Sequence, residues 1–157
     1  MVKLYKNIDE VLHYHEAWTY ENIITEHWGE VGSKGSNREY PVDPKLTEDD
    51  NLRHILKPVY EQDYKEIDID DHVLLILEYK IDDFGSPDDL SKRNSLEDKL
   101  NNLLGWTGLG ECDGGSIGSG TMEVACFVVD YSIAETMIVD ALRETECADY
   151  SRIYQME

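Results

Sequence analysis

The stretch from Val73 to Ile81 constrains the fold of this chain more than any other. It reads Val-Leu-Leu-Ile-Leu-Glu-Tyr-Lys-Ile, a short continuous apolar run that is typical of a central β-strand. A second strand is predicted from Thr121 to Asp130, a weaker one from about Thr107 to Ser116, and a last one from Tyr150 to Met156. The second half of the chain therefore predicts a four-stranded sheet.

Two helices are predicted between these strands. Ser95 is a suitable N-cap for the first helix and Gly105 can end it, while Asp82 to Lys92 is predicted to be a loop. Ser132 and Glu135 have the spacing of a capping box for the second helix. The apolar stripes are Leu96, Leu100, Leu103 and Leu104 in the first helix, and Ile133, Ala134, Met137, Ile138, Ala141 and Leu142 in the second. The resulting order, β-α-β-β-α-β, resembles the ferredoxin-like plan, an antiparallel sheet with both helices on one face.

The first 71 residues predict a smaller sheet and one helix. Two strands, Val11 to Trp18 and Ile23 to Gly32, are rich in β-branched and aromatic residues and flank a plausible two-residue turn. Short strands are predicted around residues 38–42 and 64–67. Thr47 followed by acids is typical of a helix start, and Pro58 is expected to end or kink that helix.

Trp18, the run Trp28-Gly29-Glu30-Val31-Gly32 and Gly35 form a pattern that resembles the WGR domain, a small nucleic-acid-associated module, over about residues 10–70. Glu30 stands where the family has its arginine, and a carboxylate at that position repels phosphate. We therefore expect the shape of the family without its nucleic-acid binding. The alternative is that both tryptophans are core residues and the glycines serve turn geometry. The chain is thus predicted to be α+β, with a WGR-like segment at residues 1–71 and a ferredoxin-like segment at residues 72–157.

The chain is strongly acidic throughout. It carries 34 Asp and Glu against 14 Lys and Arg, a net charge of -20, of which residues 1–71 contribute -9 and residues 72–157 contribute -11. This charge excludes partners that are held by their phosphates, namely nucleic acid and anionic membrane surfaces. It favours an acidic face that docks onto a basic partner, although acidity that merely aids solubility is the alternative.

Other features concern the compartment and the cysteines. No apolar run approaches the roughly 20 residues that span a bilayer, and the N-terminus shows no secretory signal, so we expect a soluble, cytoplasmic protein. Cys112, Cys126 and Cys147 are odd in number and widely spaced, which favours buried reduced thiols over a disulfide framework or a zinc site.

No catalytic constellation is evident, so we predict a protein that is not an enzyme and has no cofactor or metal. His13, His15 and His27 could converge from neighbouring strands on a metal, but nothing supplies a fourth ligand. The acid-rich loops lack the spacing of an EF-hand. The glycines from Gly114 to Gly120 lie between two predicted strands, which favours a mobile hairpin over a phosphate loop.

The sequence favours a non-enzymatic binding protein, most concretely a bacterial immunity-type protein that neutralises a basic toxin or nuclease. The expected contacts are exposed acids: Glu30, Asp68, Asp70, Asp71, Asp82, Asp83, Asp88 and Asp89. Two alternatives remain open. One is a regulatory domain with a small molecule in a cleft between the two segments, and the other is an enzyme that uses a metal held by the three histidines. The partner and the oligomeric state are not predicted.

Overall fold

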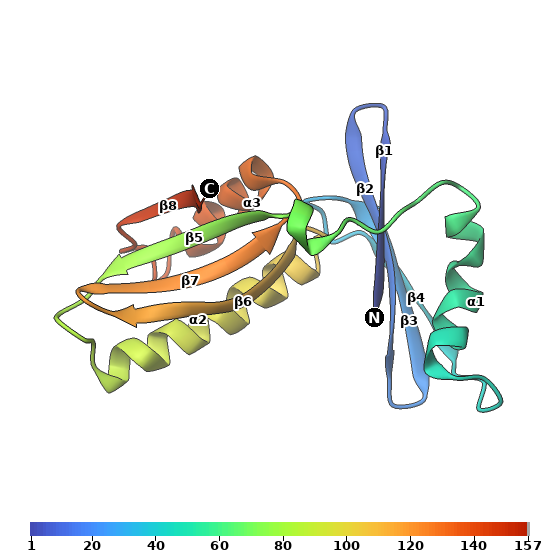
Figure 1. Ribbon diagram of the computed structural model, residues 1–157, viewed down its shortest axis with the longest axis horizontal. Helices are drawn as coiled ribbons and strands as arrows, with labels where there is room; N and C mark the ends of the chain where they lie inside the picture. The colour runs from blue at the N-terminus through green and yellow to red at the C-terminus, as the bar shows by residue number, and fades with distance from the viewer. Residues whose placement is uncertain (157) are drawn as a thin grey trace.

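A computed structural model describes residues 1–156 and shows two four-stranded antiparallel sheets with three α-helices in that range (Figure 1). The first sheet has the spatial order β1-β2-β3-β4, and the second has the order β6-β7-β5-β8. The strands are β1 (Val2–Ile8), β2 (Val11–Tyr20), β3 (Ile23–Glu30), β4 (Ser36–Pro41), β5 (Val73–Lys80), β6 (Gly110–Gly118), β7 (Thr121–Val128) and β8 (Arg152–Met156). The helices are α1 (Glu48–Tyr60), α2 (Pro87–Gly105) and α3 (Tyr131–Leu142). The predicted α+β class is confirmed.

The first sheet has α1 on one face, seen at the right of Figure 1. Apolar residues from the sheet and from α1 form one of the two cores: Leu4, Ala17, Ile24, Leu52, Leu56 and Val59. β1 was not predicted, and the strand expected at residues 64–67 is reduced to a single bridge between Lys65 and Tyr5. Pro58 lies inside the last turn of α1 and does not end the helix before it.

The second sheet contains the predicted elements in the predicted order, β5-α2-β6-β7-α3-β8. β5 lies between β7 and β8 and pairs antiparallel with both, as expected for a central strand. Alternate residues of β5 and β7 face the apolar stripes of α2 and α3 in a single core, so both helices cover the same face. The core residues from these four elements are Leu75, Leu77, Tyr79, Met122, Val124, Cys126, Val128, Leu96, Leu100, Leu104, Ala134, Ile138 and Leu142.

Two helix starts differ from the expectation. α2 begins at Pro87 because Ser86 and Asp89 form a capping box and proline suits the first helical position, so much of the expected loop from Asp82 to Lys92 is helical. α3 begins after Asp130, whose side chain accepts a hydrogen bond from the N–H of Ile133, and not after Ser132. The predicted end of α2 at Gly105 is confirmed.

The prediction of three reduced thiols is wrong for two of them, because Cys112 and Cys126 form a disulfide. These residues stand directly opposite each other on β6 and β7, so their side chains lie on the same face of the sheet within bonding reach. The pairing of β6 with β7 could not be placed residue by residue from the sequence, since a β-bulge shifts the register between Cys112 and Gly115. Cys147 is free and half-buried.

The two sheets meet through a continuous core. Tyr5, Tyr14 and Val31 of the first segment belong to the core of the second sheet and its helices. The hydroxyl of Tyr5 donates to the carbonyl oxygen of Gly108 at 2.9 Å, and the N–H of Gly32 donates to the carbonyl oxygen of Thr107 at 2.8 Å. The end of α2 and the turn after it therefore rest on the face of the first sheet that lies opposite α1 (Figure 1).

Within residues 1–156, none of the helices has the length and apolar character needed to cross a bilayer.

Candidate functional site

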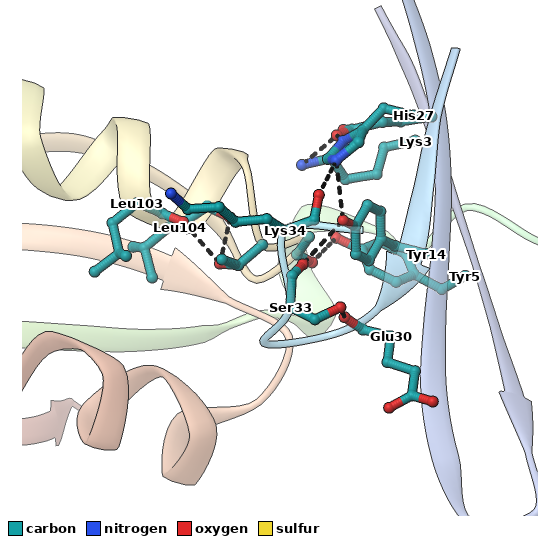
Figure 2. A network of polar contacts seen from close by, with 12 residues as sticks. Lys3, Tyr5, Tyr14, His27, Glu30, Ser33, Lys34, Leu103 and Leu104 are labelled. Carbon is teal, nitrogen blue, oxygen red and sulfur yellow. Dashed lines mark hydrogen bonds and ion pairs between the residues drawn. The ribbon is translucent and has the colours of Figure 1, made fainter. Parts of the chain in front are cut away.

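The acidic residues predicted as contacts lie in three separate places. Glu30 is the exposed last residue of β3, and its side chain points away from the polar network drawn in Figure 2. Asp68, Asp70 and Asp71 surround a short 3-10 turn immediately before β5. Asp82 and Asp83 follow the other end of β5. Because a strand rises about 3.3 Å per residue, the length of β5 puts roughly 25 Å between these two groups of acids. The structure thus does not gather the predicted acids into one surface.

The third group is built around an exposed aromatic ring. Phe84 is 82% exposed, the largest exposed fraction among the large hydrophobic residues described, and it is flanked in sequence by Asp82, Asp83 and Asp88. We call these four residues the acidic tip. Its loop is pinned to the β6–β7 turn, because the N–H of Gly120 donates to the carbonyl oxygen of Asp83 at 2.7 Å. The loop therefore presents Phe84 from a fixed backbone.

Asp89, the neighbour of the acidic tip, has a structural role that the tip acids lack. Its carboxylate accepts hydrogen bonds from the N–H of Ser86 at 2.8 Å and from the Ser86 hydroxyl at 2.7 Å. The hydrogen bond from the Ser86 hydroxyl, and to a smaller extent the one from the Ser86 N–H, lowers the pKa of Asp89 below its ordinary value. Asp89 was predicted as a partner contact, but one of its carboxylate oxygens, Oδ2, is engaged in capping α2.

The three histidines do not converge, which overturns the geometry on which the metal hypothesis depends. His27 stands opposite Glu16 in the pairing of β2 with β3, so it shares a face with Glu16. His13 and His15 alternate with Glu16 along β2 and point to the other face of the sheet. Among residues 1–156, no group of three or more His, Cys, Asp or Glu side chains is arranged to hold a metal ion.

His27 is instead the centre of a buried polar network at the junction of the two sheets (Figure 2). Its Nδ1 lies 2.7 Å from Glu16 Oε1, and its Nε2 lies 2.6 Å from the carbonyl oxygen of Lys34. Lys3 Nζ lies 3.0 Å from the second oxygen of Glu16. Lys3, Glu16 and His27 are consecutive cross-strand neighbours on β1, β2 and β3, so the sheet register places all three on the same face.

The partners of His27 determine its protonation. Burial by itself would lower the pKa of His27, but the hydrogen bonds to Glu16 and to the Lys34 carbonyl, together with the charge of Glu16, raise it above its ordinary value. Both partners can only accept hydrogen bonds, so an imidazolium satisfies both ring nitrogens. The Tyr14 hydroxyl donates to the carbonyl oxygen of Ser33 at 3.0 Å and can then accept from Nε2 at 3.1 Å.

Two tryptophans from different elements pack around the His27 ring. The His27 ring centroid lies 5.0 Å from that of Trp106, which follows α2, and 6.1 Å from that of Trp18 on β2. Trp18 and Trp106 meet edge to face at 5.8 Å with an interplanar angle of 86°. This aromatic group joins the two sheets, and Trp106 remains 40% exposed.

An open cleft of about 490 Å³ lies beside this group, between the first sheet and the C-terminal half of α2. We call it the inter-sheet cleft. The charged and aromatic residues that line it are Lys3, Glu16, Trp18, Asp98, Trp106 and Glu111. A cleft between the two segments was predicted as an alternative, but Lys3, Glu16, Asp98, Trp106 and Glu111 were not. Local sequence patterns carry no signal for them, because only the strand register and the docking of α2 bring them together.

The residues of the WGR-like pattern are spread over both faces of the first sheet. Trp28 alternates with His27 on β3 and stacks on His15 at 5.6 Å, on the face opposite the His27 network and the inter-sheet cleft. Gly35 has a φ of +60°, and a Cβ there would overlap the carbonyl oxygen of Trp28, so the turn requires glycine at this position. No protein-family model, curated protein or solved structure matches this chain. The resemblance therefore stays a prediction.

Proposed function

We propose that this chain is a non-enzymatic binding protein that recognises a basic protein through its acidic tip. The observation that carries this proposal is Phe84, an aromatic side chain held 82% exposed on a pinned loop among carboxylates. Exposed aromatic residues on fixed loops are the usual anchors of protein–protein interfaces. The surrounding charge favours a partner with Lys and Arg around an apolar pocket.

The distribution of charge supports this proposal. Among residues 1–156, six carboxylates form ion pairs with Lys, Arg or His, and Asp82, Asp83 and Asp88 are not among them. With a net charge of -20, the chain attracts a cationic protein over long range and speeds its association. The most concrete form of the proposal is a bacterial immunity-type protein that blocks a basic toxin or nuclease by covering its cationic surface.

The test compares three variants with the wild-type chain as tagged bait in its native cells, with cross-linking before purification. Phe84→Ala removes the aromatic anchor, and D82N/D83N removes two tip charges, since asparagine tolerates the positive φ of Asp83. E144Q/E146Q is the matched control, because it removes the same charge from exposed residues after α3. Asp89 is left intact because it caps α2.

Binding of the captured partner is then measured by calorimetry with purified proteins at low and high salt. We expect a basic partner whose dissociation constant rises about thirtyfold with Phe84→Ala, as for the loss of an anchor residue. D82N/D83N should weaken binding and reduce its salt dependence, while E144Q/E146Q should do neither. An acidic partner, or equal binding by the wild-type and tip variants, would contradict the proposal.

A further inference from the structure

We propose that the inter-sheet cleft binds a small organic cation, a molecule that carries a guanidinium or alkylammonium group. This inference is independent of the acidic tip. The cleft is lined from β1, β2, the C-terminal half of α2 and the start of β6, whereas the tip lies at the other end of the second sheet.

The size and position of the cleft suit such a ligand. Its volume of about 490 Å³ lies within the range of roughly 300–1,000 Å³ that is usual for small-molecule sites. It lies where two sheets with separate helices meet, which is also where such sites commonly occur. The continuous core and the hydrogen bonds between Gly32 and Thr107 and between Tyr5 and Gly108 hold the two sides of the cleft in place.

The charges in the cleft select the sign of the ligand. Lys3 has the cationic side chain among the lining residues, and its ammonium group is paired with the buried carboxylate of Glu16 at 3.0 Å. Asp98 and Glu111 are exposed and belong to none of the ion pairs formed within residues 1–156. A cation can pair with either of these two carboxylates, whereas both would repel an anion.

The aromatic residues add a second reason for a cation. A cation within about 6 Å of a tryptophan ring is attracted by the negative face of the ring. Trp18 and Trp106 line the cleft, and Trp106 keeps 40% of its surface accessible. Trp106 already packs at 5.0 Å from the ring of His27 on the protein side. Carboxylates beside two tryptophans therefore make a site for an organic cation and not for a metal ion, which would need more oxygen ligands.

The experiment uses the fluorescence of the two cleft tryptophans. In a Trp28→Phe background the remaining tryptophans, Trp18 and Trp106, both line the cleft, since Trp28 lies on the opposite face of the first sheet. The probes are agmatine and tetramethylammonium, with glutarate as the anionic comparison, all at constant ionic strength. We expect a saturable change in emission with both cations and none with glutarate, and calorimetry on the wild-type chain should give the same affinities.

The variants locate the site. D98N/E111Q should weaken agmatine binding about tenfold, as should Trp106→Leu. Asp98 and Glu111 are exposed and hold no ion pair within the described residues, so D98N/E111Q should keep the wild-type melting temperature. E144Q/E146Q and the tip variant D82N/D83N should bind agmatine like the wild type, which separates this proposal from the proposed protein partner. The inference would be overturned if neither agmatine nor tetramethylammonium gave a saturable change in emission, or if D98N/E111Q bound agmatine with the wild-type affinity.

Discussion

The buried pair of His27 and Glu16 makes a specific prediction about stability. His27→Ala removes the cation that faces a carboxylate whose side chain is only 4% exposed. Breaking a buried charge pair by removing one partner costs about 3–5 kcal/mol. Lys3 still compensates Glu16 in the variant, so we expect a loss near the lower end, about 3 kcal/mol. His54→Ala, which removes an exposed imidazole on α1, should cost less than about 0.5 kcal/mol.

The contribution of His27 should also depend on pH in a defined direction. The pKa of His27 is raised in the folded protein above its ordinary value of 6.5, so the folded state binds the proton more tightly than the unfolded state. The stabilisation is therefore complete below 6.5 and is lost as the pH rises through the folded pKa. A single proton limits the slope to about 1.4 kcal/mol per pH unit.

The assay is urea unfolding, followed by tryptophan fluorescence and circular dichroism, from about pH 6 to about pH 9 at constant ionic strength. The difference in unfolding free energy between the wild type and His27→Ala should shrink as the pH rises. Glu16→Gln removes the hydrogen bond that raises the pKa, so it should flatten the same pH dependence. If the difference in unfolding free energy between the wild type and His27→Ala stays constant or grows with pH, His27 is not held as an imidazolium.

Three further predictions concern the framework around the site. Gly108→Ala should destabilise the protein by about 1–3 kcal/mol in urea unfolding, because φ is +65° and the added methyl group would overlap the ring of Tyr14. Reduction of the bond between Cys112 and Cys126, which are 14 residues apart, should cost about 3 kcal/mol and lower the melting temperature, while a C112A/C126A variant should not respond to reductant. Ser86→Ala should cost about 1 kcal/mol through the lost cap of α2, and an unchanged midpoint of unfolding would contradict the capping box.

The elements that could be predicted from the sequence are those with strong local signals. The apolar run of β5, the alternation along β7 and the glycine that ends α2 each reflect a neighbourhood of a few residues. β1 was missed because it has both faces covered, with Leu4 in the core under α1 and the adjacent Tyr5 in the other core. Leu4 and Tyr5 are adjacent and both buried, with a lysine on each side of the pair. The sequence of β1 therefore shows neither the alternation of a half-buried strand nor the continuous apolar run of a fully buried one.

The start of α2 was wrong for a different reason, since its signal is present in the sequence. Ser86 followed by Pro87 and Asp89 satisfies the capping-box pattern as well as Ser95 does. The turns of α2 that follow Ser86 lack the regular apolar stripe of the later ones, so the start was predicted at Ser95, where the stripe begins. The capping residues therefore fix the start of this helix better than its hydrophobic period does.

The candidate site was mostly beyond reach from the sequence. Lys3, Glu16 and His27 become neighbours through the register of three strands, and one of these strands was not predicted. Trp106 joins them only because α2 ends against the first sheet. By contrast, Phe84 and its flanking acids are contiguous in sequence, which is why the tip acids were selected in advance even though the exposure of Phe84 was not foreseen.

The continuous core has a consequence for how the chain loses its structure. A fragment that ends at residue 71 would expose Tyr5, Tyr14 and Val31 to water together with the buried charges around His27. Such a fragment would lose much of the apolar burial that offsets the entropy of ordering its backbone. The two sheets should therefore melt in one cooperative transition, and a molecule held between them would raise the melting temperature of both sheets together.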